Sequence, residues 1–169
     1  MAFRPIHQTR TTRQEDETMH LTKDIKKYIN QSILCWLATT SADGIPNVSP
    51  KEIFNHYGTE EIIIANIASP QTVRNIRQND DVCVSFIDIL VQKGYQIKGK
   101  AVILKNSDTG FSEREKVLVD MTGGKYPFST ITNITIRQVK SIIAPKYLLY
   151  PETTEAQQIE SAKAAYGLL

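Results

Sequence analysis

The sequence has few of the residues that build metal sites and disulfide frameworks. Its 169 residues include two cysteines and three histidines. Cys35 and Cys83 are far apart and each lies in an apolar run, so we expect two buried thiols rather than a disulfide. No cysteine or carboxylate accompanies a histidine at the spacing of metal ligands, so the sequence predicts no metal site.

The chain also lacks a strong net charge and long apolar segments. The formal net charge is +2, and no basic patch alternates with aromatic residues, so neither nucleic acid nor a membrane surface is an expected partner. No run approaches the length of a membrane-spanning helix, and the N-terminus has no apolar signal core, which together predict a cytoplasmic protein. Residues 1–20 are polar and aperiodic, so we expect a disordered extension before a single domain over residues 21–169.

Runs of β-branched and aromatic residues predict six strands. These strands cover residues 33–40, 47–57, 61–67, 82–88, 95–105 and 130–143. Capping residues and helical periodicity predict helices at about residues 22–31, 70–79, 112–121 and 154–166. Most connections between strands are too short for the crossover helices of a parallel sheet. The fold class is therefore mainly β, a small antiparallel barrel with short peripheral helices.

Four residues in these strands carry further expectations. Pro50 cannot donate to a strand ladder, so its strand must lie at an edge or contain a bulge. Gly99 either lets another backbone or a flat ring come close, or marks a simple bend. Trp36 stands in a strand that is apolar on both faces, which predicts a core position. Lys51 is either a cation beside a ligand or a side chain whose ammonium reaches water along the surface.

The segment NIASPQTVRNIRQND, residues 66–80, separates two strands by far more than a hairpin needs. Serine is a preferred helix cap and proline a preferred first helical residue, so Ser69 and Pro70 predict a helix start. Free backbone amides at a helix start attract anions, and Thr72 and Arg74 would add a hydroxyl and a charge. The segment is thus either a phosphate site or an ordinary short surface helix.

Three longer segments, in their order and spacing, resemble the pyridoxamine 5′-phosphate oxidase-related family of FMN-binding split barrels. They are ILCWLATTSADGIPNVSPKEIF, ANIASPQTVRNIRQNDDVCVSFID and QKGYQIKGKA. The C-terminal APKYLLYPETTEAQQIESAKAAYG is also similar to a subgroup of predicted flavin-nucleotide-binding proteins. The resemblance implies a six-stranded split barrel, FMN as the cofactor, and a homodimer with two flavin sites at its interface.

The same resemblance implies which residues bind the cofactor. One strand would run past the isoalloxazine ring, a second segment would approach the ring, and a third would hold the phosphate. The corresponding residues are Val48, Ser49, Pro50 and Lys51 for the strand, Ala65 and Asn66 for the second segment, and Ser69, Gln71, Thr72 and Arg74 for the phosphate.

Two departures from the family pattern bear on activity. The family commonly has lysine where Gln71 stands, so one phosphate cation is missing, and Arg74 is a candidate replacement. The chain ends in an alanine-rich helix, whereas true pyridoxamine 5′-phosphate oxidases end in a substrate-binding tail with tryptophan and arginine, so we do not expect that reaction.

The activity that the resemblance implies is an FMN-dependent oxidoreductase with a small-molecule electron donor or acceptor such as NAD(P)H. The flavin would carry the redox chemistry, and Lys51 would stand near its pyrimidine end. No catalytic residue is identified. Two alternatives stay open: a flavin carrier or sensor without turnover, and a barrel dimer that binds no cofactor.

Overall fold

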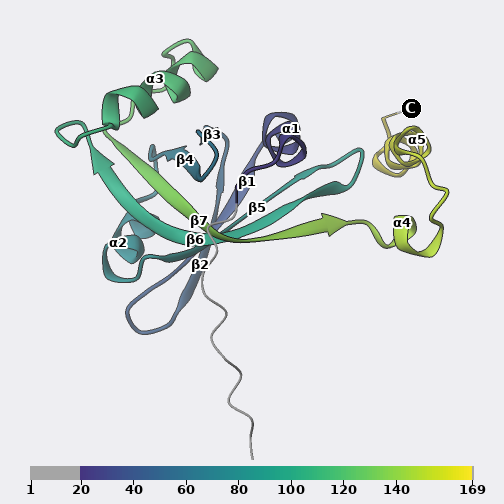
Figure 1. Ribbon diagram of the computed structural model, residues 1–169, viewed down its shortest axis with the longest axis horizontal. Coiled ribbons are helices and arrows are strands. Elements are labelled where there is room, and N and C mark those ends of the chain that lie inside the picture. Colours follow the sequence, from purple (N-terminus) through teal and green to yellow (C-terminus); the bar gives the residue numbers. More distant parts are fainter. Residues whose placement is uncertain (1–19, 169) are drawn as a thin grey trace, which may run out of the picture.

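The computed structural model describes residues 20–168, so the extension predicted for residues 1–20 lies, apart from His20, outside the described residues. Within the described part of the chain, seven strands form one antiparallel sheet in the order β2-β1-β5-β6-β7-β4-β3 (Figure 1). The strands are β1 (Cys35–Thr40), β2 (Pro46–Lys51), β3 (Phe54–Tyr57), β4 (Glu61–Ala65), β5 (Asp81–Asp88), β6 (Lys93–Lys105) and β7 (Thr130–Ile143). The helices are α1 (Lys23–Gln31), α2 (Pro70–Gln78), α3 (Phe111–Thr122), α4 (Pro145–Leu149) and α5 (Glu155–Tyr166).

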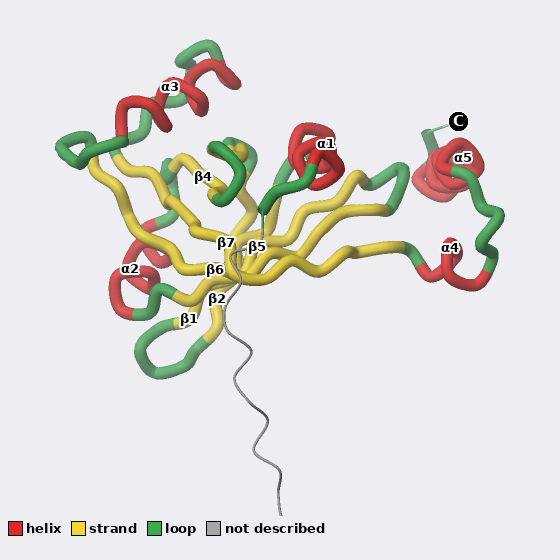
Figure 2. The backbone as a smooth tube through the Cα atoms, viewed as in Figure 1, coloured by secondary structure: helices red, strands yellow, loops and turns green. Residues whose placement is uncertain are grey.

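The sheet curls into an open half-barrel, as the tube in Figure 2 shows. The mainly β, antiparallel split-barrel prediction is confirmed, but the predicted count of six strands is wrong. The strand expected over residues 47–57 breaks at Glu52 and Ile53 and becomes β2 and β3. These two strands are consecutive in the chain but lie at opposite edges of the sheet. Pro50 therefore lies on an edge strand, as predicted, where its missing amide costs no ladder bond.

The inner face of the curled sheet holds the main hydrophobic core. Alternate residues of the strands point inward, as the period of two along a strand requires. Helices α1 and α2 both add apolar side chains to this core. Fully buried members include Cys35, Leu37, Ile62, Ile64, Val84, Ile97 and Ile134.

Helix α3 covers part of the outer face, over β3, β4 and β7, where a second apolar cluster lies. Arg114 connects this helix to the sheet through three contacts. Its guanidinium donates to Glu61 Oε2 at 2.6 Å and to Asn133 Oδ1 at 2.7 Å, and it lies 4.2 Å from the centre of the Tyr57 ring. The rest of the outer face, over β1, β2, β5 and β6, has no helix packed on it in Figure 1.

This uncovered part of the outer face corrects one expectation from the sequence. Strand β1 alternates between buried and exposed residues instead of being covered on both sides. Trp36 points outward and is 49% exposed, so the prediction that it lies in the core is wrong. Cys35 is buried as expected, whereas Cys83, on the outer face of β5, is half-buried.

Gly99 marks a close approach between two backbones. The pairing of β6 with β7 shifts by one residue between Lys98 and Gly99. A Cβ atom placed on Gly99 would stand 2.3 Å from the carbonyl oxygen of Thr135. The close backbone approach expected for this glycine is therefore confirmed, and the shift in pairing marks a bulge at the same point.

The C-terminal region folds back on the β5–β6 hairpin. Thr154 and Gln157 form the predicted capping box at the start of α5. The Glu155 carboxylate accepts a hydrogen bond from Lys93 Nζ at 2.9 Å and one from the Tyr28 hydroxyl at 3.2 Å. Among the described residues, no helix is long and apolar enough to cross a membrane.

Candidate functional site

The first turn of α2 packs directly on the inner side of the edge strand β2. The period of two places Ser49 and Lys51 on the side of β2 that faces α2. The Ser49 hydroxyl lies 3.1 Å from the Thr72 hydroxyl, and Lys51 Nζ donates a hydrogen bond to the Ser69 hydroxyl. Four of the residues predicted to bind the cofactor therefore meet at one place, although they come from two segments of the chain.

The Lys51 ammonium is buried without a carboxylate partner in the described part of the chain. The residue is only 5% exposed, and the hydrogen-bond acceptor that it finds is the neutral Ser69 hydroxyl. Burial lowers the pKa of Lys51, whose neighbour across the strand pair is Cys35. Cys35 is itself buried, which raises the pKa of its thiol to about 12, so the Cys35 thiol stays neutral. The expectation that the Lys51 ammonium reaches water along the surface is therefore wrong.

The start of α2 keeps hydrogen-bond donors free of intrahelical partners. The first helical bond of the segment runs from the Val73 amide to the Ser69 carbonyl. Pro70 has no amide hydrogen, so the amides of Gln71 and Thr72 precede that bond and have no acceptor within the helix. Ser69 occupies the predicted capping position, but its side chain makes no capping hydrogen bond. The helix start thus presents amides and hydroxyls beside a buried cation.

A series of hydrogen bonds between polar side chains connects the next turn of α2 to β1. Arg74 Nη2 donates to Gln71 Oε1 at 2.7 Å, and Gln71 Nε2 donates to Asn75 Oδ1 at 2.7 Å. Asn75 Nδ2 in turn donates to the Thr39 hydroxyl at 3.1 Å. Asn75 is 1% exposed. Arg74 and Gln71 therefore lie at the rim of the site, held there through a buried asparagine.

Asn66 lies in the loop between β4 and α2. Its Oδ1 accepts a hydrogen bond from the Thr132 hydroxyl at 2.9 Å, and its backbone amide donates to the Thr130 carbonyl at 3.0 Å. Its Nδ2 is buried and has no partner among the described residues. A buried donor without an acceptor is costly, so an acceptor that reached this atom would stabilise the site. The neighbouring Ala65 is buried at the end of β4.

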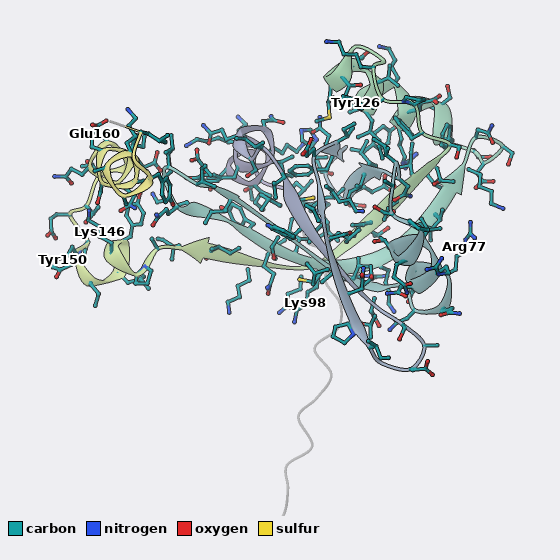
Figure 3. All side chains as sticks on the ribbon, turned by 180° about the vertical axis from the view of Figure 1, so that it is seen from behind. Arg77, Lys98, Tyr126, Lys146, Tyr150 and Glu160 are labelled. Carbon is teal, nitrogen blue, oxygen red and sulfur yellow. The ribbon has the colours of Figure 1, made fainter. Side chains whose placement is uncertain are left out.

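The remaining predicted residues face away from this cluster. Val48 and Pro50 alternate with Ser49 and Lys51 along β2, so they point to the outer face, where Val48 is 56% exposed. Arg77, which was not among the predicted residues, lies about one turn beyond Arg74 and extends into solvent (Figure 3).

Asn75 and Thr39 are the members of the site that sequence reasoning missed. On α2 the structure buries Thr72, Asn75 and Ile76. The available signal was the spacing of three between Ser69, Thr72 and Asn75. Residues three apart share one face of a helix, and a polar stripe next to a strand is compatible with a buried polar network.

Comparisons with known proteins agree with this fold. The family model of pyridoxamine 5′-phosphate oxidase matches residues 21–142. None of the curated proteins matches the chain. Among solved structures, HupZ of Group A Streptococcus is 23% identical, with a TM-score of 0.60 over 70% of this chain and 91% of that chain.

Two further solved structures have names that mention ligands. An FMN-binding protein of Syntrophomonas wolfei subsp. wolfei is 16% identical, with a TM-score of 0.60 over 71% of this chain and 84% of that one. HutZ, the heme storage protein of Vibrio cholerae, is 17% identical, with a TM-score of 0.59 over 74% and 95% of the two chains. At these identities the likeness concerns the fold.

The curled antiparallel sheet with its peripheral helices defines a split-barrel protein. Because the family model spans most of the chain, the chain belongs to the pyridoxamine 5′-phosphate oxidase family.

Proposed function

We propose that the chain binds FMN, with the phosphate at the start of α2, and that it acts as a flavin-dependent oxidoreductase. The observation that carries this proposal is the buried Lys51 ammonium beside the first turn of α2. A buried charge is costly unless an opposite charge or good hydrogen bonds compensate it. The Ser69 hydroxyl supplies one hydrogen bond and no charge, so a phosphate dianion would complete the site.

The donor set at this place suits a phosphate. A phosphate offers acceptor oxygens only, and the cluster offers an ammonium group, two backbone amides and the hydroxyls of Ser49, Ser69 and Thr72. On binding, the hydroxyl–hydroxyl and lysine–serine bonds would be exchanged for charge-assisted bonds, which are stronger. The unpartnered Nδ2 of Asn66 is a donor suited to a carbonyl oxygen of the flavin ring.

Bound FMN would supply hydride transfer to or from a small molecule such as NAD(P)H. The residues of the chain would hold the cofactor and set its surroundings. Lys51 would supply its positive charge at the phosphate, and not at the pyrimidine end of the ring as the resemblance implied. Gln71 would hold Arg74 at the rim, where the guanidinium would attract a second anion or close over the phosphate.

Titration of the protein with FMN tests this proposal. We expect wild-type protein to bind FMN and Lys51→Gln to bind it about tenfold more weakly or worse, because one charge-assisted hydrogen bond is lost. Lys116→Gln is the matched control, since Lys116 pairs with Asp120 on the exposed side of α3. Isothermal calorimetry measures the affinities, and hemin serves as a competing ligand.

Two results would contradict the proposal: wild-type protein that takes up no FMN, or equal FMN affinity in the wild type and Lys51→Gln. Oxidation of NADPH by the FMN-loaded protein then separates an oxidoreductase from a carrier. A carrier would bind FMN but would not consume NADPH in the presence of an electron acceptor.

A further inference from the structure

The candidate phosphate site holds less positive charge than a phosphate monoester brings in negative charge. Such a monoester carries about −1.5 to −2 charges at pH 7. Lys51 supplies one positive charge, and the start of a helix supplies the equivalent of about half a charge. The hydroxyls of Ser49, Ser69 and Thr72 donate hydrogen bonds but are neutral. A fully ionised monoester would therefore keep about half a negative charge without compensation.

Arg74 is placed to supply the missing charge. It follows the first turn of α2, and the side chains of a helix point back toward its N-terminus. The Arg74 guanidinium accordingly reaches Gln71 on the first turn, where Nη2 donates to Gln71 Oε1 at 2.7 Å. Within residues 20–168 no carboxylate pairs with this guanidinium. Its charge is therefore available to an anion at the helix start.

Buried side chains beneath Gln71 set the orientation of its amide. Gln71 Nε2 donates to Asn75 Oδ1 at 2.7 Å, and Asn75 Nδ2 donates to the Thr39 hydroxyl at 3.1 Å. The same hydroxyl accepts a hydrogen bond from Asn47 Nδ2 of β2 at 3.4 Å. Asn75 and Thr39 are 1% and 2% exposed, so these groups have little freedom to turn. With Nε2 engaged in this way, Oε1 is the atom of Gln71 that remains to accept from Arg74.

A glutamine at position 71 suits the arginine at position 74. A cation at position 71 would lie on the same side of the helix as Arg74, where like charges repel each other. Glutamine instead offers an acceptor. The guanidinium has five N–H donors in a planar fork, and the bond to Gln71 uses one of them. The other donors remain for phosphate oxygens, which arginine binds through paired hydrogen bonds.

Arg77 provides a contrast on the same helix. It lies three residues beyond Arg74 and extends into solvent (Figure 3). A long side chain that moves freely loses rotamer entropy when it binds a ligand. The hydrogen bond to Gln71 already limits the rotamers of Arg74, so Arg74 would lose less entropy on binding a phosphate than Arg77 would.

We propose that Gln71 is a positioning residue that holds Arg74 as the second cation of the phosphate site. Arg74 would contact the phosphate oxygens, and Gln71 would act through Arg74 without touching the phosphate. This inference rests on the proposed function, because it requires a phosphate at the start of α2. Of the two roles open to Arg74, the charge balance favours closure over the phosphate.

Titrations of the full-length protein with FMN and with riboflavin test the proposal. Arg74→Gln should bind FMN about fivefold more weakly, the effect of one exposed charge pair at the upper end of its range. Gln71→Leu removes no charge but should still weaken FMN about threefold, because it frees the guanidinium. In the double variant, Gln71→Leu should cost nothing beyond the loss from Arg74→Gln, since Gln71 acts only through Arg74. Riboflavin, which has no phosphate, should bind equally well to the wild type and all variants.

Two further variants separate positioning from general charge. Arg77→Gln removes the same charge from the same helix and should change FMN affinity by less than twofold. Arg74→Lys keeps the charge without the planar fork and should recover part of the affinity that Arg74→Gln loses. The melting temperature of each variant confirms that it folds.

Four outcomes would overturn the proposal. They are wild-type FMN affinity in Arg74→Gln, an equal loss in Arg77→Gln, losses that add up in the double variant, and parallel losses for riboflavin. Lys51-dependent FMN binding together with any of these four would overturn this inference alone. Wild-type protein that takes up no FMN would overturn the proposed function and this inference with it.

Discussion

At the scale of single residues, Lys51 is the side chain on which the candidate site depends. Its ammonium group is buried, and that burial lowers its pKa. The unfolded chain therefore holds this proton more tightly than the folded chain does. By linkage, the contribution of Lys51 to stability improves as the pH rises toward its ordinary pKa of 10.5. A bound phosphate would offset part of the free-energy cost of burying the Lys51 ammonium. The ligand and the folded state should therefore stabilise each other.

Thr72 tests where the phosphate lies. Thr72→Ala removes one hydroxyl donor from the first turn of α2, so FMN should bind about fivefold to tenfold more weakly, the effect of about one hydrogen bond. Riboflavin, which has no phosphate, should lose little affinity. Thr72→Ser keeps the hydroxyl and serves as the control. Fluorescence titration with both flavins measures the effect, and equal losses for FMN and riboflavin would place Thr72 away from the phosphate.

Local rules predicted some residues of the site and not others. Ser69 and Pro70 follow the preferences of a helix start, and these preferences depend only on neighbouring residues. The burial of Lys51 and Asn75 depends on the packing of α2 against β2 and β1. No local pattern in the sequence indicates this packing. Trp36 was misplaced for a related reason. An apolar residue in a strand is compatible with either face, and only the tertiary structure shows which face is covered.

At the scale of elements, the pairing of β6 with β7 is irregular at Gly99. The shift in pairing leaves an extra residue on β7 opposite this point. Such bulges bend the strand and increase its twist, which helps a sheet to curl. The backbone of Thr135 comes close enough here to exclude any side chain on residue 99.

Gly99→Ala should lower the free energy of unfolding by about 1–3 kcal/mol, the usual cost of overpacking. The new methyl group would meet the Thr135 carbonyl and the Ile134 side chain, so the backbone must shift. Urea denaturation measures the change. Val102→Ala, at a 52% exposed position on the same strand, is the control and should cost much less. Equal stability of Gly99→Ala and the wild type would show that the bulge tolerates a side chain.

The attachment of α5 depends on one carboxylate. Glu155 lies near three groups on other elements: Lys93 at 2.9 Å, Lys27 at 3.8 Å and the Tyr28 hydroxyl at 3.2 Å. The hydrogen bond from Lys93 is the main cause that lowers the pKa of Glu155 below its ordinary 4.5. A lowered carboxylate pKa stabilises the fold above the unfolded pKa, and this contribution is lost as the pH falls through the folded pKa.

Glu155→Gln should therefore destabilise the protein by less than about 1 kcal/mol at pH 7, because the side chain is 42% exposed and solvent screens its ion pairs. The difference from the wild type should shrink as the pH falls below 4.5 and the native carboxylate takes up a proton. Thermal melts of both proteins across this range measure the effect. Glu113→Gln, on α3, provides a comparison away from this cluster. A difference that stays constant down to pH 3 would rule out the ionic interaction as its source.

Capping signals predicted the boundaries of α5, but the cap predicted at Ser112 is wrong, because α3 begins at Phe111 after Gly110 and has no side-chain cap. The Thr154 capping box and Gly167 mark α5 at both ends, and the structure places the helix between them. The break between β2 and β3 has no comparable local signal. The chain there leaves one sheet edge for the other, which is a property of the curled sheet as a whole. Helix α4 was also missed, because five residues are too few to show a period.

At the scale of the whole molecule, the outer face of β1 and β2 supports a second copy of the chain as a partner. Trp36 and Val48 lie on this face of the two paired strands and are 49% and 56% exposed. Contiguous exposed apolar surface is typical of association surfaces. We propose a homodimer, as the family resemblance implies.

Light scattering on a size-exclusion column tests this assembly. The expected result is a mass twice that of the chain, stable on dilution into the micromolar range. A mass equal to one chain at all concentrations, with and without FMN, would exclude the homodimer.

The central claim is that the start of α2, together with Lys51 of β2, holds the phosphate of FMN. A crystal structure of the protein grown with excess FMN tests it most directly. The account predicts phosphate density in contact with Lys51 Nζ and the hydroxyls of Ser69 and Thr72, with the ring system beside β2. Flavin bound elsewhere, or a structure in which Lys51 and Ser69 still bond only to each other, would contradict the account.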